Sequence, residues 1–361
     1  MKAHPTLLLA VLPCLLCLPA TAAPVDETVK TLEEAVTLSR AQNGLEHPDT
    51  LTAMDNLALH HSEAGHREEA LKLAEPLRPL FLKTLGAEHP STLIAGNNLA
   101  KFYFEAGRRE ESFQLAEKAL PLCRKVLGPE HPTTLAAMAN LATSYYAAGQ
   151  PAEALRMQQD LLPLSRKVLG PEHAQTLAVM QNLAGYRMKA GRKEEAITMM
   201  EELLPVLRRL HGAESLRTLS AENDLGIFYA TAGRINEGLG MLNEVVTVRR
   251  RVLGPAHADT VQATKIRSAV EYILARQYAR GDGVPKDHVE AYKWMSLAAQ
   301  EGHLAAKRDL SVLEGQMTPE QIHEGQKRAA DRQSPAKEVP PPGDTGKKSR
   351  KGVPPRRSKL V

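Results

Sequence analysis

One nine-residue phrase recurs along this chain at a fixed spacing of 42 residues, and this period constrains the fold more than any other feature. Its second copy reads Leu85-Gly-Ala-Glu-His-Pro-Ser-Thr-Leu93. The six copies occupy residues 43–51, 85–93, 127–135, 169–177, 211–219 and 253–261. A fixed period of this length is typical of stacked-repeat proteins, in which each unit buries its apolar face only against its neighbours. The period therefore favours a binding surface over a reaction centre.

Two helical patterns separated by a glycine lie between successive phrases. In the second unit, apolar residues recur at helical spacing over about 91–105 and again over about 109–126, with Gly107 between them. Gly128 ends the second pattern, and the proline of the phrase suits the first position of the next helix. Each unit is therefore predicted to be a helix–turn–helix hairpin, which makes the chain an all-α protein.

The second helix of the unit carries two further recurring features. Small residues follow the turn glycine and allow close helix approach; they are Ala70, Ser112, Ala154, Ala196 and Gly238. A proline stands inside the helix at Pro79, Pro121, Pro163 and Pro205. Because an interior proline removes a backbone hydrogen bond, each of these helices is expected to kink or restart there.

The unit resembles the tetratricopeptide repeat in the 42-residue form found in kinesin light chains. The resemblance rests on the phrase and on Asn98-Leu99-Ala100, followed by Tyr103 and Gly107. It implies a right-handed α-solenoid of stacked helix–turn–helix repeats, in which the first helix of each unit lines the concave face. On this basis residues 49–258 form five repeats, and residues 23–48 hold a helix that caps the amino-terminal end.

Residues 259–333 form a different, related module. Over 269–310 the chain resembles a Sel-one-like repeat, with the turn Gly281-Asp-Gly-Val284, then Trp294 and Ala298-Ala299 in order. The glycine pair is not read as a phosphate loop, because it joins two helices and lacks the Lys-Ser/Thr ending. A last helix over about 319–331 is predicted from Thr318 and Gln321, which form a capping box.

A ladder of polar residues occupies one equivalent site in the first helix of the units. Its members are Asn56, Asn98, Asn140, Asn182 and, in the fifth unit, Asp224. An amide both donates and accepts hydrogen bonds, so it can pair with the backbone of an extended peptide of any sequence. In the resembling families an asparagine here contacts bound peptide. The alternative is that these residues only bond neighbouring helices, and one residue can do both.

The groove lacks the lysines with which some tetratricopeptide domains hold a terminal carboxylate. The equivalent positions are Thr52, Ile94, Ala136, Ala178 and Ser220. Lys101, Glu105 and Lys189 offer mixed charge further along the groove. The expected partner is therefore an internal peptide segment or a partner protein, and no small-molecule substrate is expected.

The histidines of the phrase precede a helix start, at His47, His89, His131, His173 and His257. Stacked units lie about 10 Å apart, so ligand bonds of about 2 Å cannot converge across them, and a capping or turn role is expected. The pair His60-His61 is read as a solvated surface. With no Ser/His/Asp or Cys/His constellation in a recognisable motif, we expect no enzyme activity, no cofactor and no metal. Cys123 is expected to be a packed thiol.

The amino-terminal 22 residues are interpreted as a cleaved signal peptide. A short positive start precedes an apolar segment over 7–18 and the small residues Ala20-Thr-Ala22. An uncleaved anchor is the alternative interpretation. Export predicts a bacterial periplasmic or secreted protein, and cleavage removes Cys14 and Cys17, which leaves Cys123 without a disulfide partner.

The tail over 334–361 differs from the rest of the chain. It is rich in proline and holds eight Lys and Arg against two Asp and Glu, in a chain of net charge +4. It is predicted to be disordered. The tail could contact an anionic polymer or lipid, or remain solvated without a specific partner. Nucleic acid is not expected, because the tail has no aromatic residue to stack on bases.

Three functions remain open from the sequence. The first is a non-catalytic scaffold that binds a peptide or protein in the concave groove and assembles or chaperones an envelope complex. The second is a docking or regulatory subunit whose carboxy-terminal module or basic tail acts on cell wall or membrane. The third is a secreted effector that binds a host protein, for which no residue gives support.

Overall fold

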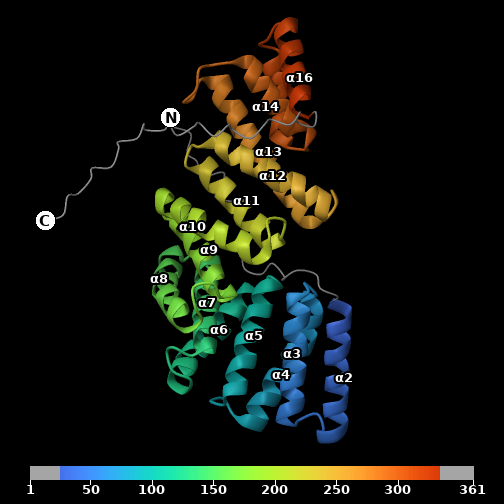
Figure 1. The fold of residues 1–361 in the computed structure, drawn as a ribbon, viewed down its shortest axis with the longest axis vertical. Helices are drawn as coiled ribbons and strands as arrows, with labels where there is room; N and C mark the ends of the chain where they lie inside the picture. Colours follow the sequence, from blue (N-terminus) through green and yellow to red (C-terminus); the bar gives the residue numbers. More distant parts are fainter. Residues whose placement is uncertain (1–24, 334–361) are drawn as a thin grey trace, which may run out of the picture.

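The computed structural model describes residues 25–333, which form fifteen α-helices and no strand (Figure 1). The first helix is α2 (Val25–Asn43). Five hairpins follow: α3 (Pro48–Glu63) with α4 (Arg67–Leu85), α5 (Pro90–Glu105) with α6 (Arg109–Val126), α7 (Pro132–Ala147) with α8 (Pro151–Val168), α9 (Ala174–Lys189) with α10 (Lys193–His211), and α11 (Leu216–Thr231) with α12 (Ile235–Val252). The last four helices are α13 (Ala258–Arg280), α14 (His288–Gln300), α15 (Leu304–Glu314) and α16 (Pro319–Gln333).

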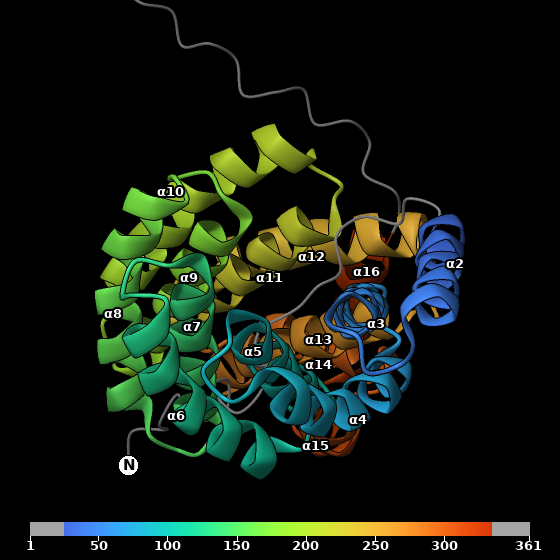
Figure 2. The same ribbon diagram turned by 90° about the horizontal axis from the view of Figure 1, so that it is seen from below.

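The hairpins stack into a superhelix. Figure 2 shows α3, α5, α7 and α9 on the inner side of the coil and α4, α6, α8 and α10 on the outer side. Seen from the amino-terminal end, the chain turns clockwise as it recedes, which makes the superhelix right-handed (Figure 2). Each helix from α2 to α14 packs on the next along the chain, and α16 packs on α14. The predicted all-α solenoid is confirmed.

The phrase acts as a helix start. In the second unit, His89 precedes α5, and its Nδ1 accepts a hydrogen bond from the backbone N–H of Ser91 at 3.1 Å. The histidines of the other phrases cap in the same way, with distances of 3.1–3.3 Å. In the fifth unit Ser215 replaces the histidine and accepts from the N–H of Thr218 at 3.2 Å. The predicted capping role is confirmed, and it satisfies a backbone donor that a helix start leaves unpaired.

Two glycines bend the chain in each unit. Gly107 has φ of 80° between α5 and α6, and Gly128 has φ of 90° after α6. A residue with a Cβ rarely adopts this left-handed conformation, so the glycine period fixes where each helix ends.

None of the four second helices that contain the proline restarts there, and a kink at the proline stays a prediction. Helices α4, α6, α8 and α10 each continue through their interior proline. The prolines at 79, 121, 163 and 205 are all exposed. A proline costs one backbone hydrogen bond, and packing of the opposite, buried face maintains the helix around it.

The core runs between the two helix layers. Its largest cluster extends from α5 to α11, and a second cluster joins α11 and α12 to the carboxy-terminal module. Cys123 is fully buried in the first cluster, and burial raises the pKa of its thiol. The predicted packed thiol is confirmed.

The small residues after the turn glycine are buried, as their spacing predicts. The closest approach is in the fifth unit, where a Cβ on Gly238 would lie 2.5 Å from the carbonyl oxygen of Gly226. The two glycines therefore let α12 cross α11 at backbone contact.

The carboxy-terminal module closes the stack through α14, which packs against α13, α15 and α16. Asp287 caps α14 by accepting from two backbone N–H groups, at 2.8 and 3.0 Å. Thr318 and Gln321 bond each other's backbone N–H groups at 3.0 and 3.3 Å, which confirms the predicted capping box of α16. The resemblance of this module to a Sel-one-like repeat stays a prediction.

The predicted signal peptide and basic tail lie outside the described residues. Within 25–333, no helix combines the length and the apolar character needed to cross a membrane.

Candidate functional site: the concave groove and the turn clusters

The ladder side chains join consecutive inner helices. Asn98 on α5 donates from Nδ2 to Asp55 Oδ2 on α3 at 2.9 Å. Asn140 on α7 repeats this contact one unit later, donating from Nδ2 to the side chain and carbonyl of Asn97 at 2.8 and 3.1 Å. The amide donors of Asn98 and Asn140 are therefore used within the stack.

The ladder changes character between the third and fourth units. On α7, Ala139 occupies the position equivalent to Asp55 and Asn97, which accept the hydrogen bonds of the preceding units. The alanine side chain therefore offers Asn182 no acceptor. Here α7 and α9 are bridged by aromatic rings, with the Tyr146 and Tyr186 centroids 4.7 Å apart. Beyond this point the polar contact reappears with its direction reversed, since Gln181 Nε2 donates to Asp224 Oδ2 at 2.7 Å.

Only part of the ladder is accessible to a ligand. Asn56 is exposed, and Asn98 and Asn140 are half-buried. Asn182 is 8% exposed and Asp224 is 2% exposed. All residues of α11 from 218 to 231 are buried. The accessible amides therefore lie on α3, α5 and α7, in the amino-terminal half of the groove.

Both predicted groove lysines already have partners. Lys101 Nζ lies 3.7 Å from Glu105 Oε1, and Glu105 also accepts a 2.6 Å hydrogen bond from Ser62. Lys189 Nζ lies 4.5 Å from the centre of the Tyr146 ring. The mixed charge expected in the groove is therefore largely engaged within the protein.

Two carboxyl groups have strongly raised pKa values: Asp55, which accepts from the ladder residue Asn98, and the ladder residue Asp224. Burial raises the pKa of Asp55 to about 6, against the opposing effect of the Asn98 hydrogen bond. Burial raises the pKa of Asp224 to about 7, opposed by the hydrogen bond from Gln181 and the charge of Arg249. One oxygen of each carboxyl is buried without a hydrogen-bond partner, which is consistent with the dominance of desolvation.

Two family models described as tetratricopeptide repeat match the chain. One matches residues 91–167 and 152–209, and the other matches residues 50–91 and 218–259. Together they cover more than half of the sequence, in the same units that form the hairpins. This chain is a tetratricopeptide-repeat protein. No curated protein sequence matches it.

Several solved structures are similar to this tetratricopeptide-repeat protein. One is a Podosopora anserina protein described as a kinesin light chain, whose TPR-like repeats are nearly identical to one another. It shares 29% identity with this chain, over 57% of this chain and 98% of that one, with a TM-score of 0.48. BtubC (BKLC) from P. vanneervenii shares 17% identity, covering 64% and 94%, with a TM-score of 0.50. A Rap protein complexed with competence and sporulation factor shares 11% identity, covering 85% and 88%, with a TM-score of 0.51. The last two likenesses concern the fold alone.

A second periodic contact of the tetratricopeptide-repeat stack was missed by the sequence reasoning. The glutamate of each of the first five phrases pairs with a basic residue 37 positions later, near the end of the following outer helix. The pairs are Glu46–Lys83 at 2.6 Å, Glu88–Lys125, Glu130–Lys167 at 2.5 Å, Glu172–Arg209 at 2.5 Å and Glu214–Arg251 at 2.8 Å. Both charges recur with the 42-residue period, so a comparison of equivalent positions would have revealed them.

A third periodic contact lies where each hairpin turns, and we name it the turn cluster. Two of its members flank the turn glycine: one lies four positions before the glycine and the other directly after it. The third is the glutamate four positions after the glycine. The fourth lies on the preceding outer helix, 32 positions before the glycine. In the second unit these are Tyr103, Arg108, Glu111 and Glu75. The Arg108 guanidinium lies 4.3 Å from the Tyr103 ring centre and pairs with both glutamates.

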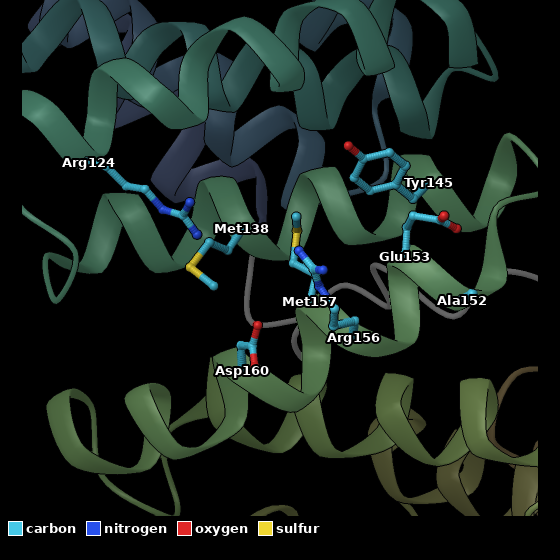
Figure 3. Close-up of a pocket in the computed structure, with 8 residues that line it drawn as sticks. All are labelled: Arg124, Met138, Tyr145, Ala152, Glu153, Arg156, Met157 and Asp160. Atoms are coloured by element: carbon cyan, nitrogen blue, oxygen red, sulfur yellow. The ribbon is translucent and has the colours of Figure 1, made fainter.

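One pocket among the described residues lies at the turn cluster of the third unit. It has a volume of about 330 Å³ and lies between α6 and α8, over α7. Figure 3 shows Tyr145 and Glu153 at one end of it and Arg124 at the other. Gln150 stands here in place of Arg108, and the shorter side chain leaves the ring of Tyr145 without a covering guanidinium.

Proposed function

We propose that this tetratricopeptide-repeat protein is a non-catalytic interaction scaffold that holds an extended peptide segment of a partner protein in the amino-terminal half of its groove. One observation carries the proposal. The amide donors of Asn98 and Asn140 bond within the stack, and no hydrogen bond of the described residues uses the Oδ1 of either side chain. These two half-buried acceptors can therefore receive backbone N–H groups of a bound chain.

The spacing of the inner helices fits such a ligand. Neighbouring packed helices lie about 10 Å apart, and an extended chain rises about 3.3 Å per residue. Successive ladder positions would then meet every third residue of the peptide. Because these contacts are to the peptide backbone, the ladder alone would recognise an extended peptide of any sequence. Other side chains in the groove would decide which peptide sequences bind.

An internal segment is the favoured ligand. On α5, the position of a carboxylate-binding lysine is occupied by Ile94, which is 39% exposed and cannot pair with a terminal carboxylate. Lys101 is already paired with Glu105. The similar Rap structure is complexed with competence and sporulation factor, and we propose binding of the same general kind here, with a different ligand.

The same proposal includes an exported location, periplasmic or secreted, and a role in assembling or chaperoning an envelope complex. It rests on the leader-like residues 1–22. The basic tail over 334–361 is proposed as a secondary contact to anionic polymer or lipid, on the basis of its charge.

Selection of a displayed random-peptide library tests the groove. The native chain should enrich related peptides, and Ile94→Glu should abolish enrichment, because it places a negative charge in the groove without touching the ladder bonds. Leu304→Glu is the matched control, since Leu304 is 81% exposed on the distant α15. Equal enrichment by the native chain and both variants would refute the proposal, as would the absence of any enrichment.

A further inference from the structure

The first unit has an unusual turn cluster. His61 and His66 occupy the positions held by Tyr103 and Arg108 in the second unit. The two carboxylate positions are kept, as Glu69 on α4 and Glu33 on α2. All four members of this turn cluster are therefore residue types that ligate metal ions.

The other units show how these four positions face one another. In the fifth unit, Arg234 lies 4.1 Å from the Tyr229 ring centre and 2.6 Å from Glu237. Tyr229 donates from its hydroxyl to Glu201 at 2.7 Å, so the glutamate of the preceding outer helix also reaches the cluster. The fold thus brings the two carboxylates of the cluster to the residues that correspond to His61 and His66.

In the first unit the two imidazoles are already close. The Nδ1 atoms of His61 and His66 lie 3.5 Å apart, and the ring centroids are separated by 5.7 Å. Two nitrogens bound to one tetrahedral zinc ion at about 2.0–2.1 Å would be about 3.4 Å apart. The observed separation is therefore close to the bite of a chelated ion.

The carboxylates of the cluster are near enough to act on the same ring. Burial and the neighbouring His66 lower the pKa of His61, while the charges of Glu33 and Glu69 oppose this effect. Both glutamates are exposed. As the side chains stand among the described residues, no three His, Cys, Asp or Glu side chains converge. Completion of a site therefore requires rotation of an exposed glutamate, or water as a ligand.

We propose that His61 and His66 chelate a divalent zinc ion, with Glu69 or Glu33 and water completing its coordination. From the sequence, the adjacent pair His60-His61 was interpreted as a solvated surface, and no metal was expected. The structure instead places His66 against His61, because the turn at Gly65 reverses the chain between them. His60 faces Glu63, with 3.9 Å between Nδ1 and Oε2, and is not part of the proposed site.

The other units lack such a site. Their equivalents of the two histidines are Tyr103 and Arg108, Tyr145 and Gln150, Arg187 and Arg192, and Tyr229 and Arg234. None of these pairs supplies two imidazoles, so the proposal predicts one ion per chain.

Equilibrium dialysis of the protein against zinc chloride, with metal analysis, tests this proposal. The native chain should bind one zinc ion saturably at micromolar free zinc. The double variant His61→Tyr with His66→Arg reproduces the second-unit pair beside the same two glutamates, so it should fold and bind zinc at least tenfold more weakly. His60→Gln is the matched control and should bind as the native chain does.

A reciprocal variant guards against loss of binding through misfolding. Tyr103→His with Arg108→His places two imidazoles beside Glu75 and Glu111, and it should raise the stoichiometry to two ions per chain. Circular dichroism confirms the helical fold of each variant. The proposal is overturned if the native chain shows no saturable zinc binding. It is also overturned if the folded variant His61→Tyr with His66→Arg binds zinc with native affinity. In either case His61 and His66 would share only a hydrogen bond.

Discussion

The side-chain amide of Asn98 donates a 2.9 Å hydrogen bond to the carboxyl group of Asp55, one unit earlier in the stack. The contact shows that a residue in a ligand-binding position of the resembling families also joins neighbouring units here. Its Nδ2 donates within the stack, and we propose that its Oδ1 accepts from a bound partner. The two interpretations of the ladder, structural and ligand-binding, are therefore compatible in one side chain.

The buried carboxyl groups of Asp55 and Asp224 should make stability depend on pH. The folded-state pKa values of Asp55 and Asp224 are about 6 and about 7, above the ordinary 3.8. The unfolded chain loses these protons at lower pH than the folded chain does. Their contribution to stability is therefore complete below about pH 3.8 and is lost as pH rises through 6 to 7.

Asp224→Asn should remove the larger part of the stability loss at high pH, because Asp224 has the larger pKa shift of the two. The asparagine still offers Gln181 a hydrogen-bond acceptor. At pH 8 the variant should be more stable than the native chain by on the order of 1–3 kcal/mol, and near pH 4 the two should be equal. Urea unfolding across this pH range measures both. Stability curves that stay parallel would show that Asp224 titrates normally.

A buried amide in the third unit should lower stability. Gln158 on α8 is fully buried, and neither of its side-chain polar atoms has a hydrogen-bond partner. The equivalent residues in the other units are Ala74, Ala116, Met200 and Leu242. Gln158→Met, which preserves volume, should stabilise the protein by about 1–2 kcal/mol. Thermal unfolding measures this, and a lower melting temperature would mean that the amide has a partner, such as water.

The histidine caps should be replaceable by serine but not by alanine. His131 Nδ1 accepts the N–H of Thr133 at 3.1 Å, at the start of α7. His131→Ala leaves that donor unpaired and should cost about 1 kcal/mol. His131→Ser should recover most of this, since Ser215 caps the fifth unit. Equal unfolding midpoints for the native chain and both variants would exclude a capping contribution.

The export proposal has a direct chemical test. Amino-terminal sequencing of the protein made in a bacterial host should find a new terminus close to Ala22, because small residues follow the apolar segment there. A mature chain that begins at Met1 or Lys2 would contradict cleavage.

The repeat architecture could be predicted from the sequence because its signals are local. The second unit was predicted to have helices over 91–105 and 109–126, and they lie at Pro90–Glu105 and Arg109–Val126. The period, the two turn glycines and the helix-start proline each act within a few residues. The restart considered at the proline of four outer helices does not occur, because burial of the opposite face outweighs the lost hydrogen bond.

The contacts between units could not be predicted in the same way. Asn98 and Asp55 are 43 residues apart, and their hydrogen bond depends on how two inner helices pack. The burial of Asp224 likewise follows from the packing around α11, not from its place in the ladder. His61 and His66 are near in sequence, but the distance between their nitrogens depends on side-chain orientation across the turn.

The central claim, that the amino-terminal half of the groove holds an extended partner segment, is tested most directly by site-specific photo-crosslinking. A photoreactive amino acid is placed either at Ile94, on the inner helix α5, or at the exposed Gln114, on the outer helix α6. We expect position 94 to crosslink to one continuous segment of a partner protein and position 114 to give no such product. Crosslinking of the same partner from position 114 with equal or greater yield would contradict this account.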